Sequence, residues 1–331
     1  MSSITGSVSF SRLVSIFRVV VPVLMTGIAM ALVAVFVDLD QLLTVLGGVR
    51  PGFVAAIALV AASMIALTVP RMMLILHQLD AVRMRIWFLL RLNFFTAIVG
   101  YMVPFGALAD GARAAVLWAE TSVSPVVALE VSAQDRVLAL LGFIVAGIVL
   151  TPFQTLADST ALDVVVAQKL FFWAAAAAIV LLALLARVMG RGVGPRWGHK
   201  LHYFVRRLMG NIIRPKYLVP QVVLAAVSNL SYALMLWFAL RAIGVTDVSY
   251  WIMLTLTPAL SISQNIPFFY LGWGSREAAA VVLLSTVAGV APSQAVGASL
   301  LVGAGVFLAS LPGLFFFAHF TRLRRAAQPR P

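Results

Sequence analysis

Two arginines, Arg113 and Arg276, end two copies of one ten-residue pattern, Pro104–Arg113 and Pro267–Arg276. The copies lie 163 residues apart, and Pro, Phe, Leu, Gly and Arg occupy the same positions in both. Each arginine comes two residues after a glycine, so we expect it in the first turn of a short helix. The unpaired N–H groups of a helix N-terminus and the planar guanidinium both bind phosphate well. The pattern therefore predicts one phosphate-binding position in each half of the chain.

Further candidate residues lie within or beside the two patterns. Ionisable side chains in apolar segments are costly and therefore indicate function, and a polar stripe at helical spacing precedes each pattern. Besides the two arginines, the candidate substrate-binding residues are Asn93, Asp110, Gly111, Arg136, Gln264, Asn265, Gly274 and Glu277.

Several of these candidates have a second interpretation. Asp110 either caps the helix that holds Arg113 or binds the cationic part of a lipid headgroup. Glu277 follows Arg276 directly, and adjacent helical residues do not face each other, so we expect its partner elsewhere, with Arg136 a candidate. Arg136 is equally consistent with a structural ion-pair group together with Asp135. The polar stripes also suit helix–helix packing in a membrane.

The composition is that of an integral membrane protein. Of the 331 residues, 62% are hydrophobic and only 11% are charged, whereas soluble domains carry about 25% charged residues. The net charge of +13 arises from basic residues at helix ends, which indicates contact with anionic lipid headgroups at the cytoplasmic face rather than nucleic acid. The sequence has no cysteine and its four histidines are scattered, so we expect no metal site and no cofactor, and no hydrolase or nucleotide-binding motif is present.

Apolar segments and loop charges predict the topology. Six full spans are expected at about 19–37, 52–70, 126–150, 170–186, 218–243 and 294–318. A basic loop at 187–217 and both termini are expected in the cytoplasm. Segment 86–122 must then enter and leave on the cytoplasmic side, and segment 250–290 must enter and leave on the outer side. The second arm of each segment is short, which favours two re-entrant hairpins. The prediction is one all-α polytopic bundle with an inverted repeat, about 52–150 and 218–318.

Three segments resemble the lysylphosphatidylglycerol synthase transmembrane family. These are Asn93–Arg113 with its Pro…Asp-x-x-Arg core, the pair Asp135 and Arg136 before an apolar helix, and Pro267–Glu277, which ends Gly-Trp-Gly-Ser-Arg-Glu. Order and spacing agree over roughly residues 10–320. The resemblance implies a bundle with re-entrant hairpins that moves aminoacylated phospholipid between leaflets. The first copy departs from the family in Phe105-Gly106 and Ala109-Asp110, and an aminoacyl-transferase domain is absent from the sequence, which leaves the headgroup open.

The sequence thus predicts translocation of a phosphate-bearing lipid, with membrane phospholipid or a lipid-linked substrate as partner. Phosphatidylglycerol, another phospholipid and a polyprenyl-phosphate sugar carrier all fit this description. Two alternatives remain: an intramembrane transferase acting on a lipid-linked substrate, and a non-transporting partner of a lipid or glycan synthase. Arginine far outnumbers lysine among the 24 basic residues, which is typical of GC-rich bacterial genomes, so we expect a bacterial cytoplasmic membrane. Assembly into a homo-oligomer is left open.

Overall fold

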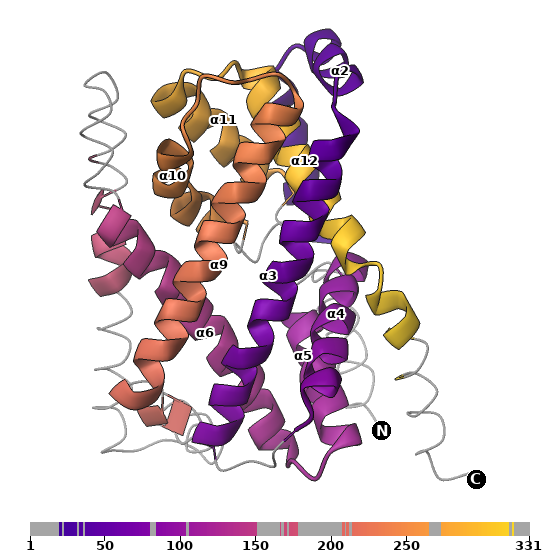
Figure 1. Ribbon diagram of the computed structural model, residues 1–331, viewed down its shortest axis with the longest axis vertical. Coiled ribbons are helices and arrows are strands. Elements are labelled where there is room, and N and C mark those ends of the chain that lie inside the picture. The colour runs from indigo at the N-terminus through magenta and orange to yellow at the C-terminus, as the bar shows by residue number, and fades with distance from the viewer. Residues whose placement is uncertain are drawn as a thin grey trace, which may run out of the picture.

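The protein is a bundle of α-helices in the computed structural model (Figure 1). The structure describes residues 20–21, 23–31, 33–35, 37–79, 84–103, 106–150, 166, 169–170, 172–177, 207–208, 210–211, 214–264, 273–317 and 320. Within these ranges there is no β-strand. The helices are α2 (Leu39–Gly47), α3 (Pro51–Gln78), α4 (Ile86–Met102), α5 (Gly106–Glu120), α6 (Pro125–Leu150), α9 (Pro215–Ala242), α10 (Tyr250–Ser263), α11 (Ser275–Ala288) and α12 (Pro292–Ser310).

Four helices, α3, α6, α9 and α12, are long and apolar enough to cross a membrane. The 28 residues of α3 extend about 42 Å at 1.5 Å per residue, more than the ~30 Å hydrocarbon core of a bilayer. The helical segment Val23–Val35 and α2 are separated by a bend of 92°, and together they make a fifth span if they are two parts of one bent crossing. These helices confirm the prediction of an all-α polytopic membrane protein.

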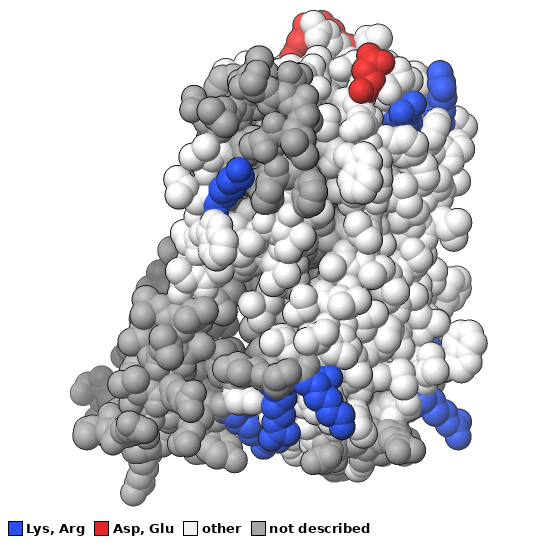
Figure 2. Space-filling view, turned by 60° about the vertical axis from the view of Figure 1, so that its left-hand side comes forward, with Lys and Arg blue, Asp and Glu red and all other residues white. Residues whose placement is uncertain are grey.

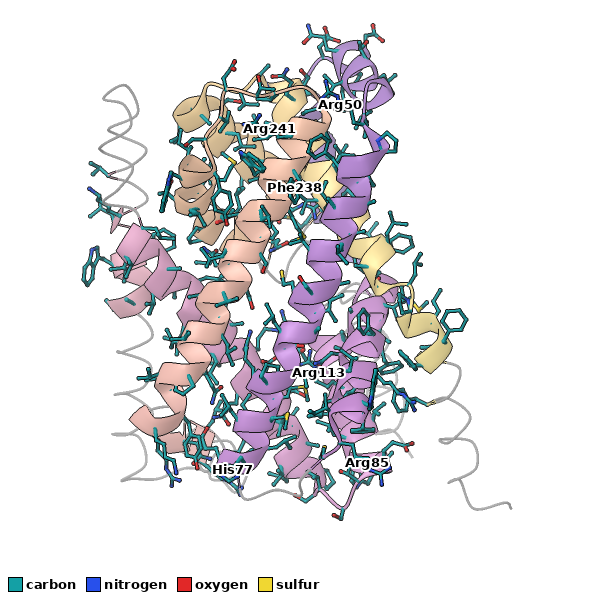
Figure 3. The ribbon with its side chains drawn as sticks, in the orientation of Figure 1. Arg50, His77, Arg85, Arg113, Phe238 and Arg241 are labelled. Atoms are coloured by element: carbon teal, nitrogen blue, oxygen red, sulfur yellow. The ribbon has the colours of Figure 1, made fainter. Side chains whose placement is uncertain are left out.

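Two pairs of shorter helices pack beside the long ones, α4 with α5 and α10 with α11. They contain 17, 15, 14 and 14 residues, which at 1.5 Å per residue is about 21–26 Å and less than a full crossing. Figure 3 places Arg85, the residue before α4, at the same end of the bundle as His77. Arg241, which precedes α10 by one short loop, lies with Arg50 at the opposite end. The two pairs therefore begin at opposite ends, whereas the re-entrant hairpins and the inverted repeat stay predictions.

Helix α3 differs from the predicted span at 52–70, because it continues to Gln78 and takes in Arg71. The sequence argument ended the span at this charge. In the structure Arg71 is buried, and an ion pair with Asp135 on α6 allows the helix to continue past it. Pro70 lies inside the same helix, directly before Arg71. Of the predicted span at 170–186, residues 170 and 172–177 are helical, and most of this span and of the basic loop 187–217 lies outside the described residues.

Helices α6 and α9 cross in close contact at Gly142 and Ala225. A Cβ on Gly142 would clash with Ala225 Cβ and would lie only 3.3 Å from its Cα. We expect Gly142→Ala to lower the free energy of unfolding by about 1–3 kcal/mol, because added volume forces packed helices apart. Thermal unfolding of the purified protein in detergent measures this loss. The double variant Gly142→Ala/Ala225→Gly should recover most of it, and a double variant no more stable than the single one would contradict the contact.

Candidate functional site: two buried arginine clusters

The first cluster joins α3, α5 and α6 around the carboxylate of Asp135. Arg113 donates from Nη1 to Asp135 Oδ2 at 2.8 Å. Arg71 Nη2 lies 2.7 Å from Asp135 Oδ1 and also donates to the backbone carbonyl of Asp135 at 2.7 Å. All three side chains are at most 10% exposed, and Figure 3 shows Arg113 among the helices between the two ends of the bundle. Two guanidinium groups thus share one carboxylate, which leaves this group one positive charge in excess.

Helix α4 supplies polar side chains on the same side as Arg113. Thr96 accepts from Arg113 Nε at 3.4 Å and itself donates to the carbonyl of Leu92. Asn93 lies three residues before Thr96, on the same face of the helix. It is buried, and neither its amide nitrogen nor its amide oxygen has a hydrogen-bond partner. A buried amide without partners is costly, so Asn93 retains its place as a candidate substrate-binding residue.

A second ion pair joins Asp110 on α5 to Arg136 on α6. Arg136 donates from Nε to Asp110 Oδ2 at 2.9 Å, and its Nη2 lies 2.7 Å from the same oxygen. The Arg136 side chain is 39% exposed, so this pair is far more accessible than the cluster at Asp135. The suggested pairing of Arg136 with Glu277 is therefore wrong.

The helix containing Arg113 begins earlier than predicted, at Gly106. Arg113 is the eighth residue of α5 rather than a residue of its first turn, and Asp110 is the fifth, so the expectation that Asp110 caps this helix is wrong. Gly111 lies inside the helix, where a Cβ would meet nothing within 4 Å. The sequence argument took Gly111 as a helix break, but an exposed glycine is tolerated within a helix at a cost of about 1 kcal/mol.

The second arginine cluster lies at the start of α11, where Arg276 is the second residue, as predicted. Glu277 Oε1 accepts from Arg276 Nε at 3.1 Å and from Nη2 at 2.7 Å. Ser299 on α12 accepts from Arg276 Nε at 2.9 Å, and the Trp273 ring lies 4.9 Å from the guanidinium carbon. The expectation that Glu277 pairs elsewhere is wrong, because a long arginine side chain at a helix start folds back onto its neighbour. This cluster is electrically neutral.

Two glycines give this second cluster its shape. Gly274 has φ +88°, a conformation that favours glycine, and its N–H donates to Glu277 Oε2 at 2.7 Å. A Cβ on Gly303 of α12 would lie 3.0 Å from Arg276 Nη1 and 3.1 Å from its Cζ, so the guanidinium lies directly on the backbone there. Tyr101 of α4 donates to the Gly303 carbonyl at 3.3 Å, which connects the first short helix pair to this region. Gln264 follows α10 directly, whereas Asn265 and residues 267–272 of the second pattern lie outside the described residues.

The sequence argument missed a third polar group, toward the end of the bundle that carries His77. Gln78 of α3 accepts from Gln134 of α6 at 2.8 Å and from Gln221 of α9 at 3.5 Å. Nearby, Glu130 accepts from Asn211 at 2.9 Å and pairs with Arg207 at 3.0 Å. Spacing gave a weak signal, since Arg71 and Gln78 are seven residues apart and Glu130 and Gln134 four apart, each pair on one helical face. Among the described residues, no group of three or more His, Asp or Glu side chains could hold a metal ion.

Together, the long apolar helices and buried ion pairs define a multi-pass α-helical membrane protein. A family model described as "Lysylphosphatidylglycerol synthase TM region" matches residues 18–313, so the chain belongs to this family. The resemblance in the three segments is thereby confirmed, and the family indicates a function related to membrane lipids. A search of curated proteins gave no match.

Proposed function

We propose that the protein moves a phosphate-bearing lipid across the bacterial cytoplasmic membrane, with Arg71 and Arg113 holding the phosphate. The observation that carries this proposal is the excess positive charge at Asp135. A buried charge without a partner is strongly unfavourable, and a phosphate monoanion or diester would neutralise it. Arg71 also has a buried Nε without a hydrogen-bond partner, and guanidinium groups bind phosphate through such paired donors.

The two short helix pairs supply a framework for access from both sides. In this proposal they are re-entrant hairpins of an inverted repeat, and one repeat rocks against the other around the site. Arg276 differs from Arg113 because Glu277 already neutralises it. Arg276 binds a phosphate only in a state in which the Arg276–Glu277 ion pair is broken. The two arginines therefore serve successive steps in the movement of one lipid across the membrane.

Surface charge supports an orientation. Figure 2 shows acidic side chains together with basic ones at the end with α2, and a group of basic side chains without visible acidic ones at the opposite end. Asp38 and Asp40 flank the start of α2, whereas Arg85 and Arg214 precede α4 and α9 at the other end. Because basic residues remain in the cytoplasm, we assign that other end to the cytoplasmic side.

Reconstitution of the purified protein into liposomes tests the proposal. With a tail-labelled phospholipid that dithionite reduces only in the outer leaflet, wild-type protein should speed exchange between leaflets. Arg113→Gln should slow it about 10- to 100-fold, since a hydrogen bond to a charged group is worth about 1.5–3 kcal/mol. The matched control is Arg91→Gln on the same short helix pair, where Arg91 contacts the Phe316 ring instead, and it should transport like wild type.

The outcomes separate the alternatives. No acceleration over protein-free liposomes across several headgroups would reject translocation. New lipid products, detected by mass spectrometry of the same liposomes, would favour a transferase. Equal transport by Arg113→Gln and wild type would remove the proposed phosphate site.

A further inference from the structure

Three glutamine side chains from three long helices meet inside the bundle. Gln78, Gln134 and Gln221, here called the glutamine triad, are all buried, with Gln134 completely so. The Gln78 oxygen accepts from the amide nitrogens of both other residues, at 2.8 Å and 3.5 Å. The triad connects α3, α6 and α9 at one point, between the arginine cluster at Asp135 and the ion pair of Glu130 with Arg207.

The backbone carbonyl of Asn211 fixes which way each amide points. It accepts a hydrogen bond from Gln78 Nε2, and a carbonyl can only accept, so the nitrogen of Gln78 must face it. The Gln78 oxygen then faces Gln134 and Gln221, which must present their nitrogens in turn. The amide orientations therefore follow from the network itself and not from an arbitrary choice between oxygen and nitrogen.

Two acceptors remain without a donor as a result. The oxygens of Gln134 and Gln221 are buried and accept no hydrogen bond, and a buried polar atom in that state destabilises a protein unless a ligand or another group satisfies it. Both are carbonyl oxygens, so the matching ligand groups are hydrogen-bond donors such as hydroxyls or amines.

The triad lies close to the phosphate site along two helices. Gln78 follows Arg71 by seven residues on α3, which places both on one face about 10 Å apart along the axis. Gln134 directly precedes Asp135 on α6. A lipid whose phosphate contacts Arg71 and Arg113 therefore has the triad within reach of a headgroup the size of glycerol or a monosaccharide.

Charge distinguishes hydroxyls from amines. The buried carboxylate nearest to the triad in the network is that of Glu130, and Arg207 neutralises it. Arg71, Arg113 and Arg207 carry three positive charges, and Asp135 and Glu130 carry two negative ones. The region is thus positive by one unit before a lipid binds, and the phosphate neutralises this excess. An ammonium group would then enter without a carboxylate free to pair with it, which leaves hydroxyls as the matching donors.

We propose that the glutamine triad selects a headgroup that carries hydroxyls and no charge beyond its phosphate. This inference rests on the proposed function, because the phosphate position comes from Arg71 and Arg113. Anionic phospholipids with a glycerol or cyclitol headgroup fit the site, whereas ethanolamine, choline and lysyl headgroups add a cation beside carboxylates that are already paired with arginines.

The test compares headgroups in the liposome assay. Tail-labelled phosphatidylglycerol and phosphatidylinositol should cross faster than phosphatidylethanolamine and phosphatidylcholine. Gln134→Met and Gln221→Met each remove one unpartnered acceptor at similar side-chain volume. Each should slow the two hydroxylated lipids about 3- to 10-fold, the effect of one hydrogen bond, and should leave phosphatidic acid, which lacks the headgroup, unchanged. Phosphatidic acid also reports correct folding, and Gln221→Met, which loses only the longer 3.5 Å contact, carries the test if Gln134→Met does not fold.

The outcomes separate this inference from the proposed function. Equal rates for all headgroups, or faster ethanolamine lipid, would overturn the headgroup selection and leave translocation standing. If the protein accelerates the crossing of no lipid, translocation is rejected. The inference is then tested by lipid binding, measured as the thermal unfolding midpoint of the purified protein in the presence of each lipid. A midpoint raised most by the hydroxylated lipids, and less so in the methionine variants, would support the triad as a binding site, and equal midpoints would overturn it.

Discussion

Replacing Asp135 with alanine is expected to lower the free energy of unfolding by about 3–5 kcal/mol, because it leaves two buried guanidinium groups without their carboxylate. Both Arg71 and Arg113 contact this one side chain, and all three are nearly excluded from solvent. No other carboxylate among the described residues forms an ion pair with either arginine. Thermal and denaturant unfolding in detergent micelles, followed by circular dichroism, measures the loss.

The matched control is Asp110→Ala, which removes a carboxylate from a neighbouring ion pair between the same two helices. The partner there, Arg136, is 39% exposed, so the protein does not enclose it and we expect a smaller loss than for Asp135→Ala. Similar losses in the two variants would contradict the view that burial makes Asp135 the centre of the site.

Replacing Glu277 with alanine is the second large expected effect, again about 3–5 kcal/mol. Its carboxylate accepts hydrogen bonds from Arg276, from Ser299 and from the N–H of Gly274, and it is completely buried. The substitution leaves the Arg276 guanidinium unpaired and removes the side chain that accepts from the N–H of Gly274, the residue that caps α11. The same unfolding measurements apply.

A double variant distinguishes charge from packing at this position. Arg276→Met/Glu277→Met removes both charges at once and leaves no unpaired ion, so it should be more stable than Glu277→Ala alone. A double variant that is less stable than the single one would show that the pair contributes through geometry rather than through neutralisation.

The sequence predicted those parts of the fold that depend on local pattern. Long apolar runs identified α3, α6, α9 and α12 because hydrophobic length is itself the physical requirement for crossing a bilayer. The two short helix pairs followed from the Pro/Gly breaks, and Arg276 is at the start of its helix because Gly274 adopts a positive φ there. Arg113 shares the pattern, yet α5 begins seven residues before it, since Gly111 can remain helical at an exposed position.

The partners of the buried charged and polar side chains could not be predicted from local pattern. Arg71 binds Asp135, 64 residues away, and this contact exists only because α3 packs on α6. The sequence argument treated Arg71 as a loop residue, since a charge normally ends an apolar run, and so the most positive part of the site was missed. The glutamine triad was missed for the same reason, because its three members come from three helices and no spacing rule joins them.

Pro70 has a consequence for how α3 moves. It has no N–H, so the carbonyl of Ala66 lacks its helical donor, and α3 bends more easily at this position than in its fully hydrogen-bonded turns. The shorter part of the helix, after Pro70, carries both Arg71 and Gln78. In the proposed function, a bend at Pro70 therefore changes the phosphate contact of Arg71 and the headgroup contact of Gln78 together.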